Sequence, residues 1–93
     1  MIAAKSDWAA QMKQELTEEN PEALLADGFD DALIGITANH HHPAVAVYDL
    51  DECIRIVMQD GSTEEEAVEY LSFNTLGAYV GEHGPLFIRT SNG

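Results

Sequence analysis

The sequence predicts one α+β domain, in which helices pack on one face of a small, mostly antiparallel sheet of three or four strands. Two observations support this prediction. Apolar residues recur at helical spacing in some segments and at the two-residue spacing of a strand in others. The chain has 93 residues, 45% of them hydrophobic, which suits a single domain with a real core and not a disordered acidic tail.

The N-terminal segment, about residues 6–27, is predicted to be helical. Ser6 can cap a first helix, which carries an apolar stripe of residues four positions apart. The stripe consists of Trp8, Met12 and Leu16. Asn20 followed by Pro21 is typical of another helix start, so we expect a short second helix that ends at Gly28.

Strands are predicted where the apolar period changes to two. Residues 32–37 alternate, with the even-numbered side chains on one face and the odd-numbered ones on the other. A loop at 39–43 connects them to a second strand at 44–48, and so short a loop allows an antiparallel pair. Two shorter strands are expected at 78–80 and 86–88, on either side of a glycine-rich turn.

A helix is predicted directly after the second strand. Asp49 and Glu52 have the spacing of a capping box, and Asp60-Gly61 should end the helix. Asp51 and Arg55 lie one turn apart and should attract each other. The residues expected to face the core are Leu50, Cys53, Ile54, Val57 and Met58.

A further helix should follow, capped by Ser62 with Glu65 or by Thr63 with Glu66, and it should end at Gly77. Its predicted inward residues are Ala67, Val68, Tyr70 and Leu71. Together with the sheet, this helix pair is expected to occupy about residues 29–89, and the whole chain 1–93 to be one domain.

The charge of the chain is its most unusual property. There are 17 Asp and Glu residues against 4 Lys and Arg, which gives a formal net charge of −13. Eight of the acids lie between Asp7 and Asp31, and eight more between Asp49 and Glu69, so the charge falls on the predicted helices and their ends. Some of it suits helix N-termini, where each carboxylate contributes about 0.3–1 kcal/mol at low salt.

Two interpretations of the remaining acid stay open. It is either an ordinary solvated surface, or a recognition surface that imitates nucleic acid and binds a Lys/Arg groove built for phosphates. In the second case the partner is a basic nucleic-acid-binding protein or complex. The candidate partner-binding residues are Glu15, Glu18, Glu19, Glu22, Asp51, Glu65, Glu66 and Glu69.

The same charge makes free nucleic acid a poor partner, because phosphates would be repelled. No apolar run approaches the length of a membrane span, and residues 1–14 lack the apolar region of a signal peptide. A single cysteine, Cys53, excludes an internal disulfide and fits a reducing compartment. We therefore expect a cytoplasmic protein that does not bind membranes.

No residue pattern predicts catalysis, a cofactor or a metal. In an extended loop only His40 and His42 of the three consecutive histidines share a side, and zinc needs three or four ligands, so a third would have to come from His83 or a carboxylate. Cys53 lies on an apolar stripe without a neighbouring base, which favours a buried structural thiol. The glycines at 77–84 lack the sequence and the following helix of a phosphate-binding loop.

The run YDLDECIRIVMQDGSTEEEAVEYLSFNTLGAYVGEHGPLFI resembles the C-terminal half of small uncharacterised proteins found in bacteria and their phages. The matching features are Tyr48-Asp49-x-Asp51, Glu-Glu-Ala-Val-Glu-Tyr, Asn74-x-x-Gly77-Ala78-Tyr79-x-Gly81-Glu82 and Pro85-x-Phe87. The resemblance implies a phage or mobile-element product and carries over no catalytic residue. Small acidic phage proteins are often inhibitors of host defence or of host nucleases, and some are DNA mimics.

Two function classes follow. The first is a non-catalytic acidic protein that inhibits a host nucleic-acid-binding or defence protein, in the manner of a DNA mimic or an anti-CRISPR protein. The second is a small accessory or dimerisation domain, for example a homodimer, that binds through exposed apolar side chains. The residues expected on such an apolar surface are Trp8, Phe29, Phe73 and Tyr79.

Overall fold

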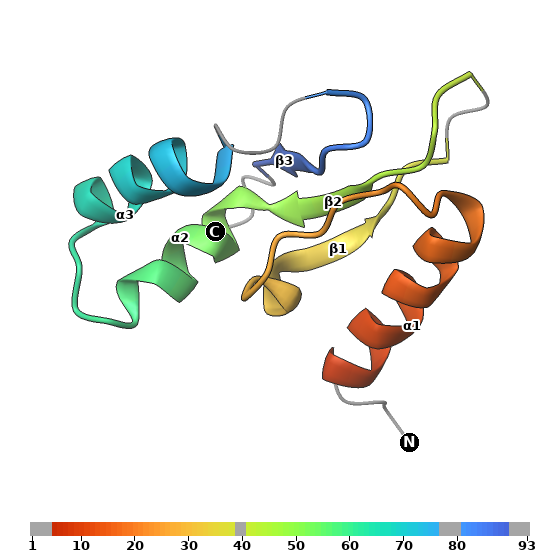
Figure 1. Cartoon of the computed structure of the whole chain (residues 1–93). Helices are drawn as coiled ribbons and strands as arrows, with labels where there is room; N and C mark the ends of the chain where they lie inside the picture. Colours follow the sequence, from red (N-terminus) through yellow and green to blue (C-terminus); the bar gives the residue numbers. More distant parts are fainter. Residues whose placement is uncertain (1–4, 39–40, 77–80, 90–93) are drawn as a thin grey trace.

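The computed structural model describes residues 5–38, 41–76 and 81–89 (Figure 1). Helices and a small sheet make up this part of the chain, which confirms the α+β class. The elements are α1 (Lys5–Glu19), the 3-10 turn η1 (Asp30–Ala32), β1 (Leu33–Ile36), β2 (Ala46–Asp49), α2 (Leu50–Met58), α3 (Glu64–Leu71), the π turn η2 (Ser72–Leu76) and β3 (Leu86–Ile88).

The three described strands form one sheet in the order β1-β2-β3. β1 and β2 are antiparallel, as expected for strands joined by a short loop. β3 pairs with β2 in parallel, with Val47 opposite Leu86 and Tyr48 opposite Phe87. The parallel direction is possible because α2 and α3 come between β2 and β3 in the sequence and return the chain to the start of the sheet (Figure 1). The fourth expected strand, 78–80, lies outside the described residues.

A bulge interrupts the pairing of β1 with β2. Leu33 pairs with Tyr48 and Gly35 with Val47, so Ile34 is an extra residue in β1. The strict alternation predicted for residues 32–37 is therefore wrong. Leu33 is buried in the core, whereas Ile34 is 40% exposed.

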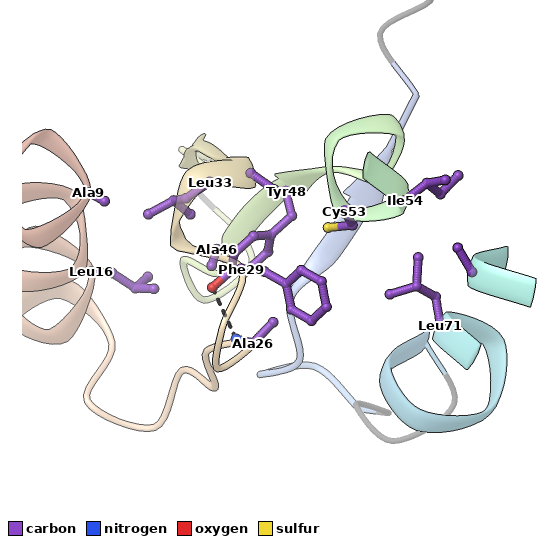
Figure 2. Packing of buried hydrophobic residues seen from close by; sticks show 12 residues of the cluster. Ala9, Leu16, Ala26, Phe29, Leu33, Ala46, Tyr48, Cys53, Ile54 and Leu71 are labelled. Carbon is purple, nitrogen blue, oxygen red and sulfur yellow. Dashed lines mark hydrogen bonds between the residues drawn. The ribbon is translucent and has the colours of Figure 1, made fainter. Parts of the chain in front are cut away.

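One hydrophobic core joins all the described helices to one face of the sheet (Figure 2). Tyr48 of β2 is fully buried at its centre and stacks on Phe87 of β3, with ring centroids 5.5 Å apart. α1 covers one end of this core, and α2 with α3 covers the other (Figure 1). The remaining buried apolar residues of the cluster are Ala9, Leu16, Ala26, Phe29, Ala32, Leu33, Ala46, Cys53, Ile54, Ala67 and Leu71.

α1 confirms the predicted stripe, because Leu16 is buried and Trp8 and Met12 pack against the core. The second helix predicted after Asn20 is absent from the described chain, which forms turns and irregular backbone between α1 and η1. Tertiary hydrogen bonds hold this segment in place of helical ones. The backbone N–H of Leu24 donates to the carbonyl of His83, and that of Ala26 donates to the Tyr48 hydroxyl.

α2 begins as predicted at Asp49, whose carboxylate accepts hydrogen bonds from the backbone N–H groups of Asp51 and Glu52. Cys53 and Ile54 are buried as predicted, whereas Met58, also predicted to face the core, is 37% exposed. The predicted pair of Asp51 with Arg55 is wrong. Arg55 instead pairs with Glu52, three positions before it on the same helix face.

α3 begins at a reciprocal capping box between Thr63 and Glu66, the second of the two predicted alternatives. Its inward face is narrower than predicted. Ala67 and Leu71 are buried, but Val68 is 43% exposed and Tyr70 is 51% exposed. The reason is that α3 is short and covers only one end of the core. The residues next to the buried pair, Ala67 and Leu71, therefore remain at the edge of the core. The predicted end at Gly77 lies outside the described residues.

Candidate functional site

Three basic side chains of the described residues form ion pairs with specific carboxylates. Lys13 pairs with Asp30 at 2.8 Å, and Arg89 pairs with Asp51 at 3.2 Å. Arg55 pairs with Glu52. All three of these acids are half-buried. The fourth half-buried acid, Asp49, caps α2. The three acids that pair with these cations are therefore all partly buried.

The remaining carboxylates point to solvent. They are Asp7, Glu15, Glu18, Glu19, Glu22, Asp27, Asp31, Asp60, Glu64, Glu65, Glu66, Glu69 and Glu82. Since Lys13, Arg55 and Arg89 bind other acids, these three cations do not neutralise this exposed set. The sequence predicts an excess of acid, and the structure places that excess almost entirely at the surface.

The predicted partner-binding residues do not form one surface. Glu15, Glu18 and Glu19 lie on the last turns of α1, and Glu22 follows in the next turn. Glu65, Glu66 and Glu69 lie on α3, together with Glu64. α1 and α3 are at opposite ends of the molecule (Figure 1).

Two of the candidates have structural roles. Asp51 is engaged by Arg89, which arrives from the end of β3. Glu66 closes the capping box of α3, where its carboxylate accepts a hydrogen bond from the backbone N–H of Thr63 at 2.8 Å. Near the same end, hydrogen bonds from Ser62 lower the pKa of the Asp60 carboxyl below its ordinary value. The other exposed acids of α3, which take no part in the capping box, are Glu64, Glu65 and Glu69.

Glu82 lies close to Glu22, which follows α1, although the two acids are 60 positions apart in the sequence and no local pattern connects them. The Nε2 atom of His83 lies 3.6 Å from a carboxylate oxygen of Glu22 and 3.6 Å from one of Glu82. Glu22 and Glu82 are therefore neighbours beside one ring nitrogen of His83. We call Glu15, Glu18, Glu19, Glu22 and Glu82 the α1 acidic surface.

The side chain of Asn20 holds Glu22 and His83 in this arrangement by hydrogen bonds. Its side chain is buried, and its Nδ2 group donates to the carbonyl of Ala44 at 2.8 Å and contacts Nδ1 of His83 at 3.1 Å. Its Oδ1 atom accepts a hydrogen bond from the backbone N–H of Glu22. Since Oδ1 is an acceptor and Nδ2 a donor, Nδ1 of His83 accepts and the ring proton lies on Nε2, facing the two carboxylates.

Cys53 is buried as predicted. Burial raises the pKa of its thiol to about 12, and the nearby carboxylates of Asp49 and Glu52 add to the effect. Such a thiol stays protonated and unreactive at neutral pH. This geometry suits the structural role expected from the sequence.

Within residues 5–38, 41–76 and 81–89, no group of three or more His, Cys, Asp and Glu side chains is arranged to hold a metal ion. His40 lies outside these residues, so the expectation that the histidine loop binds no metal stays a prediction. In the same part of the chain, every helix is too short or too polar to cross a membrane.

The predicted apolar surface is only partly confirmed. Phe29 is buried in the core, and Trp8 is half-buried against it, so neither is a free contact residue. Phe73 is 77% exposed, as expected, and Tyr79 lies outside the described residues. Comparison with protein-family models, with curated proteins and with solved structures found no match to this chain.

Proposed function

We propose that this chain is a non-catalytic binding protein whose exposed carboxylates occupy the basic, nucleic-acid-binding surface of another protein. The resemblance in the C-terminal half extends the proposal. In that form, the chain is encoded by a phage or a mobile element and inhibits a host nucleic-acid-binding or defence protein, as a DNA mimic or an anti-CRISPR protein does.

The observation that supports the proposal is the division of the carboxylates into two sets. The half-buried acids have cations or a helix N-terminus beside them, whereas the exposed acids on α1 and α3 do not share these cations. Exposed negative charges repel one another and lower the stability of a compact chain. A basic partner removes that repulsion on binding, and the negative potential accelerates its approach by about 10- to 1,000-fold.

The α1 acidic surface is the favoured contact. It gathers carboxylates from three separate segments of sequence, namely α1, the turn after it and the turn before β3. Hydrogen bonds of the buried Asn20 side chain hold the last two segments together. The backbone of a surface held in this way loses little conformational entropy when a partner binds.

The test is affinity capture from lysate of the native host with three forms of the chain. They are the wild type, an α1 variant (Glu15, Glu18, Glu19 and Glu22 to Gln) and an α3 variant (Glu64, Glu65 and Glu69 to Gln). We expect the wild type to retain a basic protein at 50 mM salt and to lose most of it at 200 mM, because salt screens exposed charges. The α1 variant should lose that protein and the α3 variant should retain it.

Both variants keep Glu66 and Asp51, which have structural roles, so circular dichroism should show wild-type folding for all three forms. If both variants retain the same protein as the wild type and salt has no effect, charge recognition is wrong. Loss in the α3 variant alone would move the contact to the other end of the molecule.

A second candidate function is an accessory domain that binds through its open sheet face. Ile34 of the bulge is 40% exposed, and Leu86 and Ile88 of β3 are 50% and 42% exposed. An apolar face of this kind predicts capture that is insensitive to salt and lost in an Ile88→Asp variant.

A further inference from the structure

A pocket lies beside Glu82, between the two ends of the β1–β2 loop and the turn that precedes β3. Its volume is about 270 Å³. Sites for drug-sized ligands have volumes of roughly 300–1,000 Å³, so this pocket suits a single long side chain. The lining side chains are Thr37, His42, Pro43, Val45, Glu82 and Leu86.

We propose that this pocket receives an arginine side chain of the basic partner. The inference rests on the proposed function, because the pocket lies against Glu82, a member of the α1 acidic surface. It adds a specific anchor to what would otherwise be contact between two charged surfaces.

The charge around the pocket favours a cation. Glu82 lines it, and the carboxylates of Glu82 and Glu22 each lie 3.6 Å from the same ring nitrogen of His83. Lys13, Arg55 and Arg89 pair with other acids and do not compete for this position. A guanidinium can bind a carboxylate through two parallel hydrogen bonds.

The walls favour the stem of an arginine over a compact, fully hydrated cation. Pro43, Val45 and Leu86 supply apolar surface against which the methylene groups of the stem can pack. Guanidinium is more weakly hydrated than ammonium, so it enters a partly apolar pocket at a lower desolvation cost.

The backbone around the pocket is held by hydrogen bonds. Thr37 and Val45 face each other, since the Thr37 N–H donates to the Val45 carbonyl and the Val45 N–H donates to the Thr37 hydroxyl. On the opposite side, Gly81 has a φ of +103°, and its carbonyl accepts a hydrogen bond from the N–H of Gly84. Glu82 is thus carried on a closed turn.

The test is a titration of the ¹⁵N-labelled full-length chain with N-acetyl-arginine amide at 20 mM salt. We expect the largest chemical-shift changes at the backbone amides of Thr37, Val45, Gly84 and Leu86. Glu82→Gln should weaken binding at least fivefold. Glu69→Gln removes the same charge from α3 and serves as the matched control, which should bind as the wild type does.

The shape of the pocket is tested by two further titrations. N-acetyl-lysine amide should bind at least threefold more weakly, and N-acetyl-norleucine amide, which has no charge, should give no saturable shifts. Two results would contradict arginine binding in the pocket. One is chemical-shift changes spread equally over the acids of α1 and α3, and the other is equal binding by Glu82→Gln and Glu69→Gln.

Capture of the partner separates this inference from the proposed function. If the α1 variant loses the partner but Glu82→Gln retains it fully, the partner contacts the α1 acidic surface but does not insert an arginine into the pocket. If no charge variant affects capture, the proposed function is wrong, and the anchor fails with it. Loss of the partner in Glu82→Gln, with retention in Glu69→Gln, supports both.

Discussion

Asn20 and His83 are 63 positions apart in the sequence, and their side chains meet at 3.1 Å between Nδ2 and Nδ1. This contact joins the end of α1 to the turn before β3. Through it, the carboxylates of Glu22 and Glu82 come to face one imidazole. The shape of the α1 acidic surface therefore depends on one buried amide.

Replacing Asn20 with Ala should lower the free energy of unfolding by about 1–3 kcal/mol, because the substitution leaves partly buried groups such as the Ala44 carbonyl without their hydrogen bond. Asn74→Ala is the matched control. Its side chain donates to the Tyr70 carbonyl at an exposed position, so a change below about 0.5 kcal/mol is expected. Chemical denaturation measures both values, and equal effects of the two substitutions would contradict the role given to Asn20.

Ile54→Ala should lower the free energy of unfolding by about 2–5 kcal/mol, since Ile54 is buried between α2 and the rest of the core. Val68→Ala is the control on the neighbouring helix. Val68 borders a hollow of about 60 Å³ and is 43% exposed, so its truncation should cost less than about 1 kcal/mol. A loss below half a kcal/mol for Ile54→Ala in urea denaturation would mean that the assignment of helix faces is wrong.

Cys53 predicts a pH dependence of stability in the alkaline range. Its pKa is raised from 9.0 to about 12 in the folded chain, so above pH 9 the unfolded chain loses a proton that the folded chain keeps. Stability from this thiol is complete below pH 9 and falls as the pH rises, by at most about 1.4 kcal/mol per pH unit. Denaturation at pH 8.0 to 10.5 should show a steeper decline for the wild type than for Cys53→Ala. Parallel declines would contradict the burial of the thiol.

The fold was predictable where sequence signals are local. Helix caps depend on residues within one turn, so Asp49 and Thr63 mark the starts of α2 and α3. The segment after Asn20 was not predictable in this way. Its Asn-Pro pair is typical of a helix start, but hydrogen bonds to the distant residues His83 and Tyr48 outweigh that preference.

For the candidate site, the sequence predicted the excess of acid but not the tertiary contacts of the individual carboxylates. The excess of acid on the helices is visible in the sequence, but its partners are not. Arg89 reaches Asp51 across 38 positions, which removes a predicted contact residue from the exposed set. Glu82, an isolated acid in the sequence, becomes a neighbour of Glu22 through the fold. Both changes arise from tertiary contacts that no local pattern encodes.

The central claim is that the chain and nucleic acid bind the same surface of the partner, and competition tests it most directly. The purified partner, identified by capture, is loaded with a fluorescent nucleic acid that it binds, and the chain is added at 100 mM salt. We predict complete displacement of the nucleic acid by the wild type and by the α3 variant, and at least tenfold weaker displacement by the α1 variant. A ternary complex of partner, nucleic acid and wild-type chain would contradict the claim.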